Sequence, residues 1–426
     1  MIAGDTLGSI AMPVPESLGR NGLTQLNEAR LTTKSDETEP SQPVPNPVCE
    51  LKHEVYVRIP DLFSSIMAQE PVENPNRSEV EAESDEWIRE IMKMDEKAAA
   101  KHMRAQFCYI SSLWTPTSDK EGLRLMTDWV NWVFLFDDQF DEGFLKDDPV
   151  ATQEEVDATM AIMSDDAPLY GPEVNPIRYV FQVCWQRIKS RASLGKLPDK
   201  VVAVVGLTVI KPGIELQQRC RDQHKFYFDQ IVVQVQRVAA GEDLASDLQT
   251  YMKMRRGTIG AYPAIAVSEC VHSIELPEHV FLHPSLQECV RISSDLILLV
   301  NDLLSYRKDV ELGTDFGVIP ILQGKGLSIQ QSIDQIGAMM NDRYRGWYTS
   351  LAELPSYGRK IDREVLKFVE VCRLVALGNL YWSFKTGRYL GAEGPYVYET
   401  KIMRLPSRKT TDSGTVGQSA VGLTCN

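Results

Sequence analysis

The sequence lacks the features that would point to a membrane protein, a disulfide-stabilised fold or a nucleophilic hydrolase. No uninterrupted apolar segment approaches the roughly 20 residues that a membrane-spanning helix requires. The 8 cysteines are scattered without CxxC or metal-ligand spacing, which argues against a disulfide framework or a zinc site and favours reduced, buried thiols. The 6 histidines stand in no recognisable nucleophile motif, so no His-centred triad is predicted.

Basic residues are in the minority. Lysine and arginine number 45 against 59 aspartates and glutamates, and the net charge of -14 argues against nucleic acid or an anionic membrane as the main partner. The first residues show no basic start followed by an apolar run, and acidic residues come too early for a transit peptide. We therefore expect a cytoplasmic protein with no stable membrane anchor, in which any anionic ligand needs extra neutralising charge.

Between residues 51 and 403 most apolar residues recur at intervals of three and four, as in EWIREIMKMDEKAAAKHM and REVLKFVEVCRLVALGNLYWSF. This period is typical of amphipathic helices and predicts one all-α domain, with no convincing sheet. Residues 1–50 and 404–426 are rich in small and polar residues and lack an apolar period, which predicts a disordered leader and a disordered tail.

One internal segment departs from the helical pattern. Residues 195–214, GKLPDKVVAVVGLTVIKPGI, form a β-branched run bounded by glycine and proline, which is typical of a strand or a loop. Our hypothesis is that the segment is a translated intron, a gene-model error or a surface loop. Sequencing the transcript decides between these, because a translated mRNA that contains these codons excludes the first two.

An apolar helical stretch runs directly into negative charge at NWVFLFDDQFDEG, residues 131–143. Asp137 and Asp141 are four residues apart and therefore share one helix face, with Asp138 beside them. Such like charges repel, and a hard divalent cation with oxygen ligands compensates them best. A solvated acidic helix end is the alternative.

A second polar stripe occurs in NDLLSYRKD, residues 301–309. Asn301, Ser305 and Asp309 follow at intervals of four, so that an amide oxygen, a hydroxyl and a carboxylate line one face of a largely apolar helix. Polar atoms on a buried face need partners. A hydrogen-bond network in the core would satisfy them, but two stripes of hard ligands on apolar helices favour a shared cation cluster.

The two motifs together resemble those of the class I terpene synthases. DDQFDE is similar to the aspartate-rich DDxx(D/E) motif and NDLLSYRKD to the NSE motif, in the order and spacing of that family. The similarity runs from about Val57 to Met403. It is greatest with fungal sesquiterpene synthases, in the stretches FLFDDQFDEG, RRGTIGAYPAI and GNLYWSFKTGRYLG. It implies a single helical bundle around a central apolar cavity.

The resemblance also implies the chemistry of the site. Farnesyl diphosphate would be the substrate, ionised with the help of three Mg²⁺ ions and cyclised with release of diphosphate, and the favoured product is presilphiperfolan-8β-ol. The metal ligands would be Asp137, Asp138, Asp141, Asn301, Ser305 and Asp309. The diphosphate-binding residues would be Arg255, which has the family's spacing before the NSE motif, with Lys308, Arg388 and Tyr389.

Two positions depart from the commonest family pattern. Asp309 stands where glutamate is more usual, which keeps the carboxylate but shortens its reach. Thr258 and Ile259 follow Arg255 where many relatives have an acidic or small residue and then glycine, and here the glycine comes one place later, at Gly260. Glycines and a proline after Arg255, inside a helical pattern, predict that the helix breaks at this point.

Carbocation chemistry requires an apolar, closed cavity. Aromatic faces stabilise positive charge by about 0.5 to 2 kcal/mol each, enough to favour one cyclisation branch over another. Phe134 and Trp382 are candidates because they lie close to the polar motifs, while Trp114 and Tyr227 are candidates by resemblance alone. The alternative for each is simple packing in the core.

Other functions remain open at this point. A chain-elongating prenyltransferase would share the fold and the magnesium chemistry, but it should carry a second aspartate-rich motif where this chain has NDLLSYRKD. A sesquiterpene synthase with a different cyclic product is a nearer alternative. A helical scaffold that binds partners through acidic faces belongs to a different class. The oligomeric state is open, with a homodimer among the options.

Overall fold

The computed structural model describes residues 50–51, 54–141, 143–193, 213–242, 247–312 and 316–406. The predicted leader and tail lie almost entirely outside the described residues, and so does the anomalous insertion except for Gly213 and Ile214, where a helix begins. Within the described residues, the predicted all-α architecture is confirmed.

Two helices in the first part of the described chain begin after an aspartate N-cap. Asp95 and Asp148 each accept a hydrogen bond from the first turn of the helix that follows them, as expected for N-caps. The elements are β1 (Glu50–Leu51), β2 (Glu54–Arg58), η1 (Ser65–Met67), α1 (Arg77–Ile91), α2 (Glu96–Ala105), α3 (Phe107–Trp114), α4 (Lys120–Asp141), α5 (Pro149–Ala161), α6 (Pro176–Ser193) and α7 (Ile214–Ala239).

The second part contains the longest helices and closes with a strand. Helix α14 begins with a capping box formed by Ser328 and Gln331. The elements are α8 (Leu248–Thr258), α9 (Ala261–Val271), α10 (Glu278–Phe281), α11 (Pro284–Leu304), α12 (Tyr306–Leu312), α13 (Val318–Gly324), α14 (Ile329–Ala352), α15 (Arg359–Lys385), η2 (Gly391–Glu393), α16 (Gly394–Thr400) and β3 (Ile402–Pro406).

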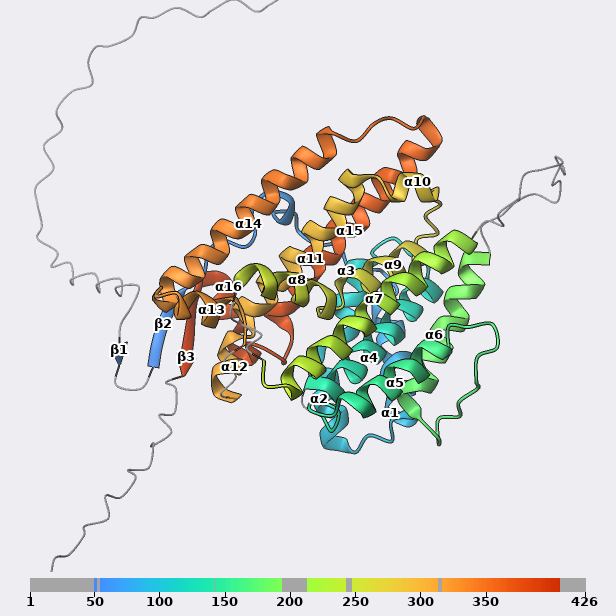
Figure 1. The fold of residues 1–426 in the computed structure, drawn as a ribbon, viewed down its shortest axis with the longest axis horizontal. Helices are drawn as coiled ribbons and strands as arrows, with labels where there is room; N and C mark the ends of the chain where they lie inside the picture. The colour runs from blue at the N-terminus through green and yellow to red at the C-terminus, as the bar shows by residue number, and fades with distance from the viewer. Residues whose placement is uncertain are drawn as a thin grey trace, which may run out of the picture. The chain divides into compact units, whose positions relative to one another are not determined.

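Helices α4 and α11, which carry the two polar motifs, both lie inside the bundle. Every residue from Ile292 to Val300 of α11 is buried, because α8, α9, α14 and α15 pack around that helix (Figure 1). Helix α4 packs against α1, α3 and α6 and buries Trp129, Trp132 and Phe136 completely. A helix that is apolar on nearly all sides is stable only when it is covered in this way.

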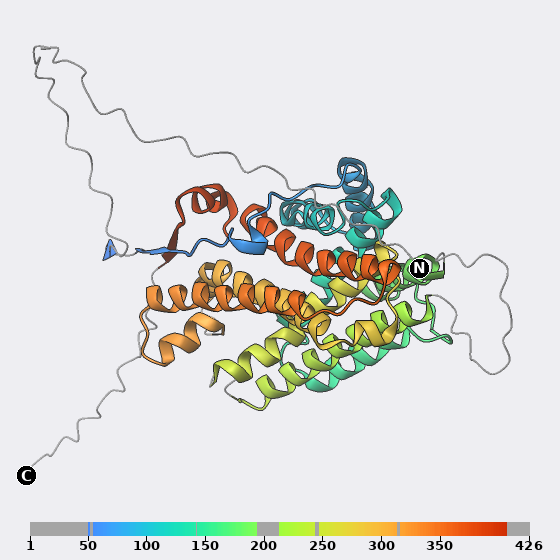
Figure 2. The same cartoon turned by 90° about the horizontal axis from the view of Figure 1, so that it is seen from above.

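The structure contains a small sheet that the helical pattern did not predict. Strands β1, β2 and β3 form an antiparallel sheet in that order (Figure 2). Arg58 of β2 pairs with Ile402 of β3. Strand β3 therefore includes residues 404–406, which the sequence analysis assigned to the tail. The expectation of no sheet was wrong because each strand is five residues or shorter and because the partner of β2, strand β3, lies at the other end of the domain.

The cysteines agree with the expectation of reduced, buried thiols. Six cysteines are free and buried in the described part of the chain, at positions 108, 184, 220, 270, 289 and 372. Cys49 and Cys425 lie outside it. Of the helices described, none has the length and apolar character that crossing a membrane demands.

Candidate active site

The carboxylates of α4 occupy the last two turns of that helix. Asp137 accepts a hydrogen bond of 2.8 Å from the hydroxyl of Tyr227 on α7, and Asp138 forms an ion pair of 2.9 Å with Arg388. Asp141 is the final residue of the helix. The apolar face of α4 fixes the helix in the core, so its polar end projects these three side chains together.

Burial, together with mutual repulsion, raises the pKa values of Asp137 and Asp141. Desolvation, followed by the charge of Asp141, raises the pKa of Asp137 to about 7, although Arg255 and the Tyr227 hydroxyl favour the ionised form. Desolvation also raises the pKa of Asp141, with a further contribution from Asp138. A nearby cation would favour the ionised form of both carboxylates.

The second stripe crosses a junction between two helices. Helix α11 ends at Leu304 and α12 begins at Tyr306, so Asn301, Ser305 and Asp309 do not share one helix. Their spacing survives, because the amide of Ser305 donates to the carbonyl of Asn301 at 2.8 Å and that of Asp309 to the carbonyl of Ser305 at 3.0 Å. The Ser305 hydroxyl also donates to Asp309 Oδ2 at 2.8 Å.

Arg255 joins the two stripes. Its Nη2 donates to Asn301 Oδ1 at 3.1 Å, and its charge acts on Asp137 and Asp141. Burial works against the charged guanidinium, but Tyr251 and the surrounding carboxylates, Asp302 first among them, raise the pKa of Arg255. The arginine is therefore a permanent cation between α4 and α11.

The predicted helix break after Arg255 is confirmed. Helix α8 ends at Thr258, and α9 starts at Ala261 after Gly260, which adopts a left-handed conformation with φ +73°. Glycine takes this conformation without the steric cost that a side chain adds. Arg255 Nη1 lies 3.4 Å from Thr258 Oγ1, so the residue at this unusual position contacts the arginine directly.

The segment that follows α15 closes the arrangement. The hydroxyl of Tyr389 accepts a hydrogen bond of 2.8 Å from Asn301 Nδ2, and the neighbouring Arg388 reaches Asp138. Lys308 on α12 acts electrostatically on Asp141 and Asp309. The structure thus brings all six predicted metal ligands and all four predicted diphosphate ligands into one connected network.

Comparison with known proteins agrees with the resemblance to the terpene synthases that the two motifs show. The family model described as "Terpene synthase family 2, C-terminal metal binding" matches residues 128–346. The (+)-eremophilene synthase of Gibberella fujikuroi is 40% identical over 354 residues, which cover 83% of this chain and 94% of that protein. The chain belongs to the terpene synthase family. The matched region of this terpene synthase includes both polar stripes and Arg255, whereas Arg388 and Tyr389 lie beyond it.

Two further similarities bear on this synthase. The silphinene synthase peniA of Penicillium patulum is 35% identical over 83% of this chain and 90% of that protein. The crystal structure of a-eudesmol synthase matches with a TM-score of 0.63 over 75% of this chain and 98% of that one, at 18% sequence identity. At that identity the likeness shows the fold alone, and the fold is that of a terpene cyclase.

The residues present suit a hard cation. Carboxylate, amide and hydroxyl oxygens are the donors that Mg²⁺ prefers. Arg255 Nε is buried and makes no hydrogen bond within the described residues, since its nearest carboxylate atom, Asp302 Oδ1, is 3.9 Å away. An unsatisfied guanidinium donor beside carboxylates whose pKa values are raised fits a site that takes up cations and an anion together.

Two of the predicted metal ligands are paired with arginines in the structure. Arg388 engages Asp138 and Arg255 engages Asn301, and in the part of the chain that the structure describes no three His, Cys, Asp or Glu side chains converge on one point. Both ligand oxygens are therefore engaged by protein donors in this arrangement.

The candidate aromatic residues fall into two groups. Phe134 and Trp382 lie 5.4 Å apart between ring centroids, and the Arg388 guanidinium stands 4.9 Å above the ring of Phe134. Tyr227 contacts the site through Asp137. Trp114 instead packs on α15, where its indole nitrogen donates to the carbonyl of Val375 at 3.0 Å.

Sequence analysis missed a buried partner of Arg255. The carboxylate of Asp302 accepts hydrogen bonds from the Tyr251 hydroxyl at 2.7 Å and from the amide of Val318 at 3.0 Å. It thereby ties α8 to α11 and to the start of α13. The signal was present, because an aspartate on the apolar side of a buried helix must find partners.

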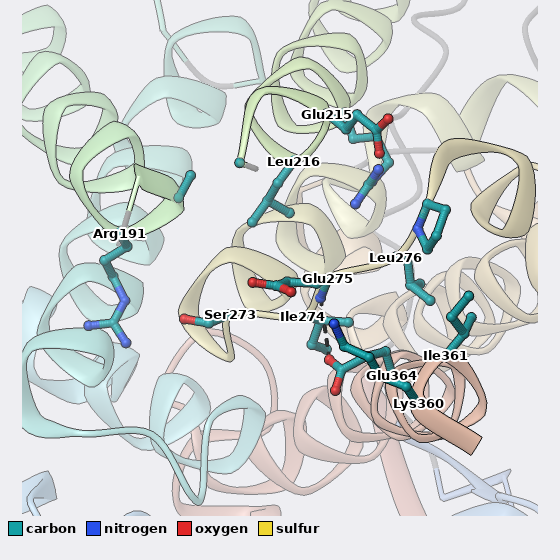
Figure 3. Close-up of a pocket in the computed structure, with 14 residues that line it drawn as sticks. Arg191, Glu215, Leu216, Ser273, Ile274, Glu275, Leu276, Lys360, Ile361 and Glu364 are labelled. Atoms are coloured by element: carbon teal, nitrogen blue, oxygen red, sulfur yellow. Dashed lines mark hydrogen bonds between the residues drawn. The ribbon is translucent and has the colours of Figure 1, made fainter. Parts of the chain in front are cut away.

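A separate hollow of about 450 Å³ lies at the N-terminal end of α7, next to the turn after α9 and the start of α15 (Figure 3). Its wall includes Arg191, Glu275 and Lys360, and none of the network residues lines it. Arg219 at its edge is already bonded to Glu269 at 2.6 Å. This hollow therefore lies apart from the polar network.

Proposed function

We propose that this terpene synthase is a sesquiterpene cyclase that ionises farnesyl diphosphate with the help of Mg²⁺, cyclises the carbocation and releases diphosphate. The observation that carries the proposal is the network in which Arg255 links the carboxylates of α4 to Asn301. The names of the relatives support the class of substrate, since the eremophilene and silphinene synthases are sesquiterpene producers by name.

Each polar group has a task in this proposal. The cations would be held by Asp137, Asp138 and Asp141 on one wall and by Asn301, Ser305 and Asp309 on the other. Bound divalent cations neutralise the diphosphate and so stabilise it as a leaving group. The four donors Arg255, Lys308, Arg388 and Tyr389 would bind the diphosphate oxygens through charge-assisted hydrogen bonds.

The protein supplies no nucleophile in this reaction, so its remaining task is to exclude water and direct the cation. The faces of Phe134 and Trp382 lie next to the polar network and would stabilise positive charge on the hydrocarbon. For Tyr227 we propose a role in holding Asp137, because its hydroxyl is already engaged there. For Trp114 the contacts with α15 favour packing behind the cavity wall.

Gas chromatography with mass spectrometry tests the proposal. The purified protein should convert farnesyl diphosphate and Mg²⁺ into a cyclic sesquiterpene, and our proposed product is presilphiperfolan-8β-ol. A different cyclic C15 product would correct the product and keep the class. Formation of longer prenyl diphosphates from farnesyl and isopentenyl diphosphates would identify a chain-elongating prenyltransferase instead.

A further inference from the structure

A cavity of about 510 Å³ lies beside the carboxylates, on the side of the site that faces α2. Asp138, Lys308 and Arg388 line it together with Lys101 and Arg104 of α2. Because Lys101 and Arg104 are exposed, the cavity reaches the surface. The cavity is therefore an approach to the polar network from solvent.

The lining of this cavity is strongly positive in a chain whose net charge is -14. Its ionised groups are four cations and one carboxylate, and that carboxylate, Asp138, is already paired with Arg388. Neither Lys101 nor Arg104 forms an ion pair with any carboxylate of the described residues. His102 adds no charge, because burial, with help from Arg388, lowers its pKa to about 4.

Helix α2 is held firmly against the segment that carries Arg388. The amide of Gly387 donates to the carbonyl of Arg104 at 2.8 Å, and the side chains of Trp382 and Thr386 donate to the carbonyl of Ala105 at 2.7 and 3.0 Å. A Cβ atom at Gly387 would stand only 3.1 Å from Arg104 Cβ. The close approach places the cations of α2 beside Arg388.

We infer that Lys101 and Arg104 form, with Lys308 and Arg388, a binding antechamber for a diphosphate group, which receives the incoming prenyl diphosphate before it reaches the metal ligands. The inference rests on the proposed function and extends its substrate site to α2. A positive recess raises the local concentration of an anionic ligand and its association rate. The same chemistry would also bind the diphosphate that leaves the site.

The test uses the full-length protein with Lys101→Gln and Arg104→Gln combined. A matched control combines Lys97→Gln on α2 with Arg89→Gln on α1, which removes the same two charges from exposed positions that do not line the cavity. Calorimetry with inorganic diphosphate and Mg²⁺ should show binding weakened about tenfold at low salt, less at high salt, and by under twofold in the control.

Steady-state kinetics separates the two sources of the diphosphate group. A fall in kcat/KM for farnesyl diphosphate with kcat unchanged assigns the antechamber to the incoming substrate, as we expect. An effect confined to inhibition by inorganic diphosphate would assign it to the leaving product and overturn the entry role. The exchange Lys101→Arg with Arg104→Lys, which retains both charges, should behave like the wild type.

The inference fails if the double variant binds diphosphate and turns over farnesyl diphosphate like its control. The proposed function fails separately if the wild type forms no terpene from farnesyl diphosphate. In that event the calorimetric comparison still decides whether α2 binds a diphosphate group.

Discussion

Replacing Asn301 with alanine separates its role in catalysis from its role in the fold. Asn301 Oδ1 accepts from Arg255 at 3.1 Å and Nδ2 donates to Tyr389 at 2.8 Å. Losing a charged and a neutral hydrogen bond costs roughly 2 to 4 kcal/mol, which is less than the usual 5 to 15 kcal/mol of domain stability. We therefore expect Asn301→Ala to fold and to unfold at a lower temperature.

The catalytic effect should be larger than the structural one. Loss of a hard ligand removes about 3 kcal/mol of transition-state stabilisation, or roughly 150-fold in kcat/KM. The measurement is the release of diphosphate and terpene at saturating Mg²⁺, corrected for the folded fraction by circular dichroism.

Asn74→Ala provides the matched control. Asn74 is also buried, and its Nδ2 donates to the carbonyls of Thr115 at 2.7 Å and Ser118 at 3.0 Å, in a loop outside the network. This change should lower the stability by a similar amount while leaving kcat/KM of the folded protein within about twofold. A folded Asn301→Ala protein with a kcat/KM within fivefold of the wild type would refute the role of Asn301.

Three further predictions concern the metal and the carboxylates. Chelation by EDTA should abolish product formation and leave the helical circular dichroism intact; a helical signal lost with the metal would contradict this. Because the pKa of Asp137 is raised from 3.8 to about 7, the stability that this group contributes to the metal-free protein should be lost progressively as the pH rises over that interval. Mg²⁺ affinity should rise from about pH 6 to 8 with proton release. Calorimetry in two buffers detects the proton, and an affinity independent of pH would count against the shift. Tyr227→Phe removes the hydrogen bond that favours ionised Asp137, so the midpoint of the Mg²⁺ affinity should move to higher pH, and an unchanged midpoint would exclude this coupling.

The parts of the site that follow helical spacing could be predicted from the sequence. Asp137 and Asp141 are one turn apart on a helix whose apolar face is unambiguous, and the glycines after Arg255 marked the break that Gly260 makes. These features depend on contacts within a few residues, which the local pattern contains.

Other features depend on partners far away in the chain. Strand β2 pairs with β3, although almost the whole domain separates the two strands in the sequence. Asp302 accepts its hydrogen bonds from Tyr251 and from the amide of Val318. The helix is interrupted at Ser305, between α11 and α12, but the i to i+4 hydrogen bonds around this residue are kept. The spacing of the polar residues in the sequence therefore gave no sign of the interruption. The cations of α2 lie beside Arg388 because Arg104 contacts Gly387, and the local sequence of α2 does not reveal this contact.

A crystal structure with Mn²⁺ and inorganic diphosphate tests most directly whether the two polar stripes share one metal-bound anion. Anomalous scattering should locate manganese within bonding distance of Asp137 on α4 and of Asn301, Ser305 and Asp309, with one diphosphate between the two groups. Manganese bound to one stripe alone, or a diphosphate that contacts neither Arg255 nor Arg388, would contradict the account.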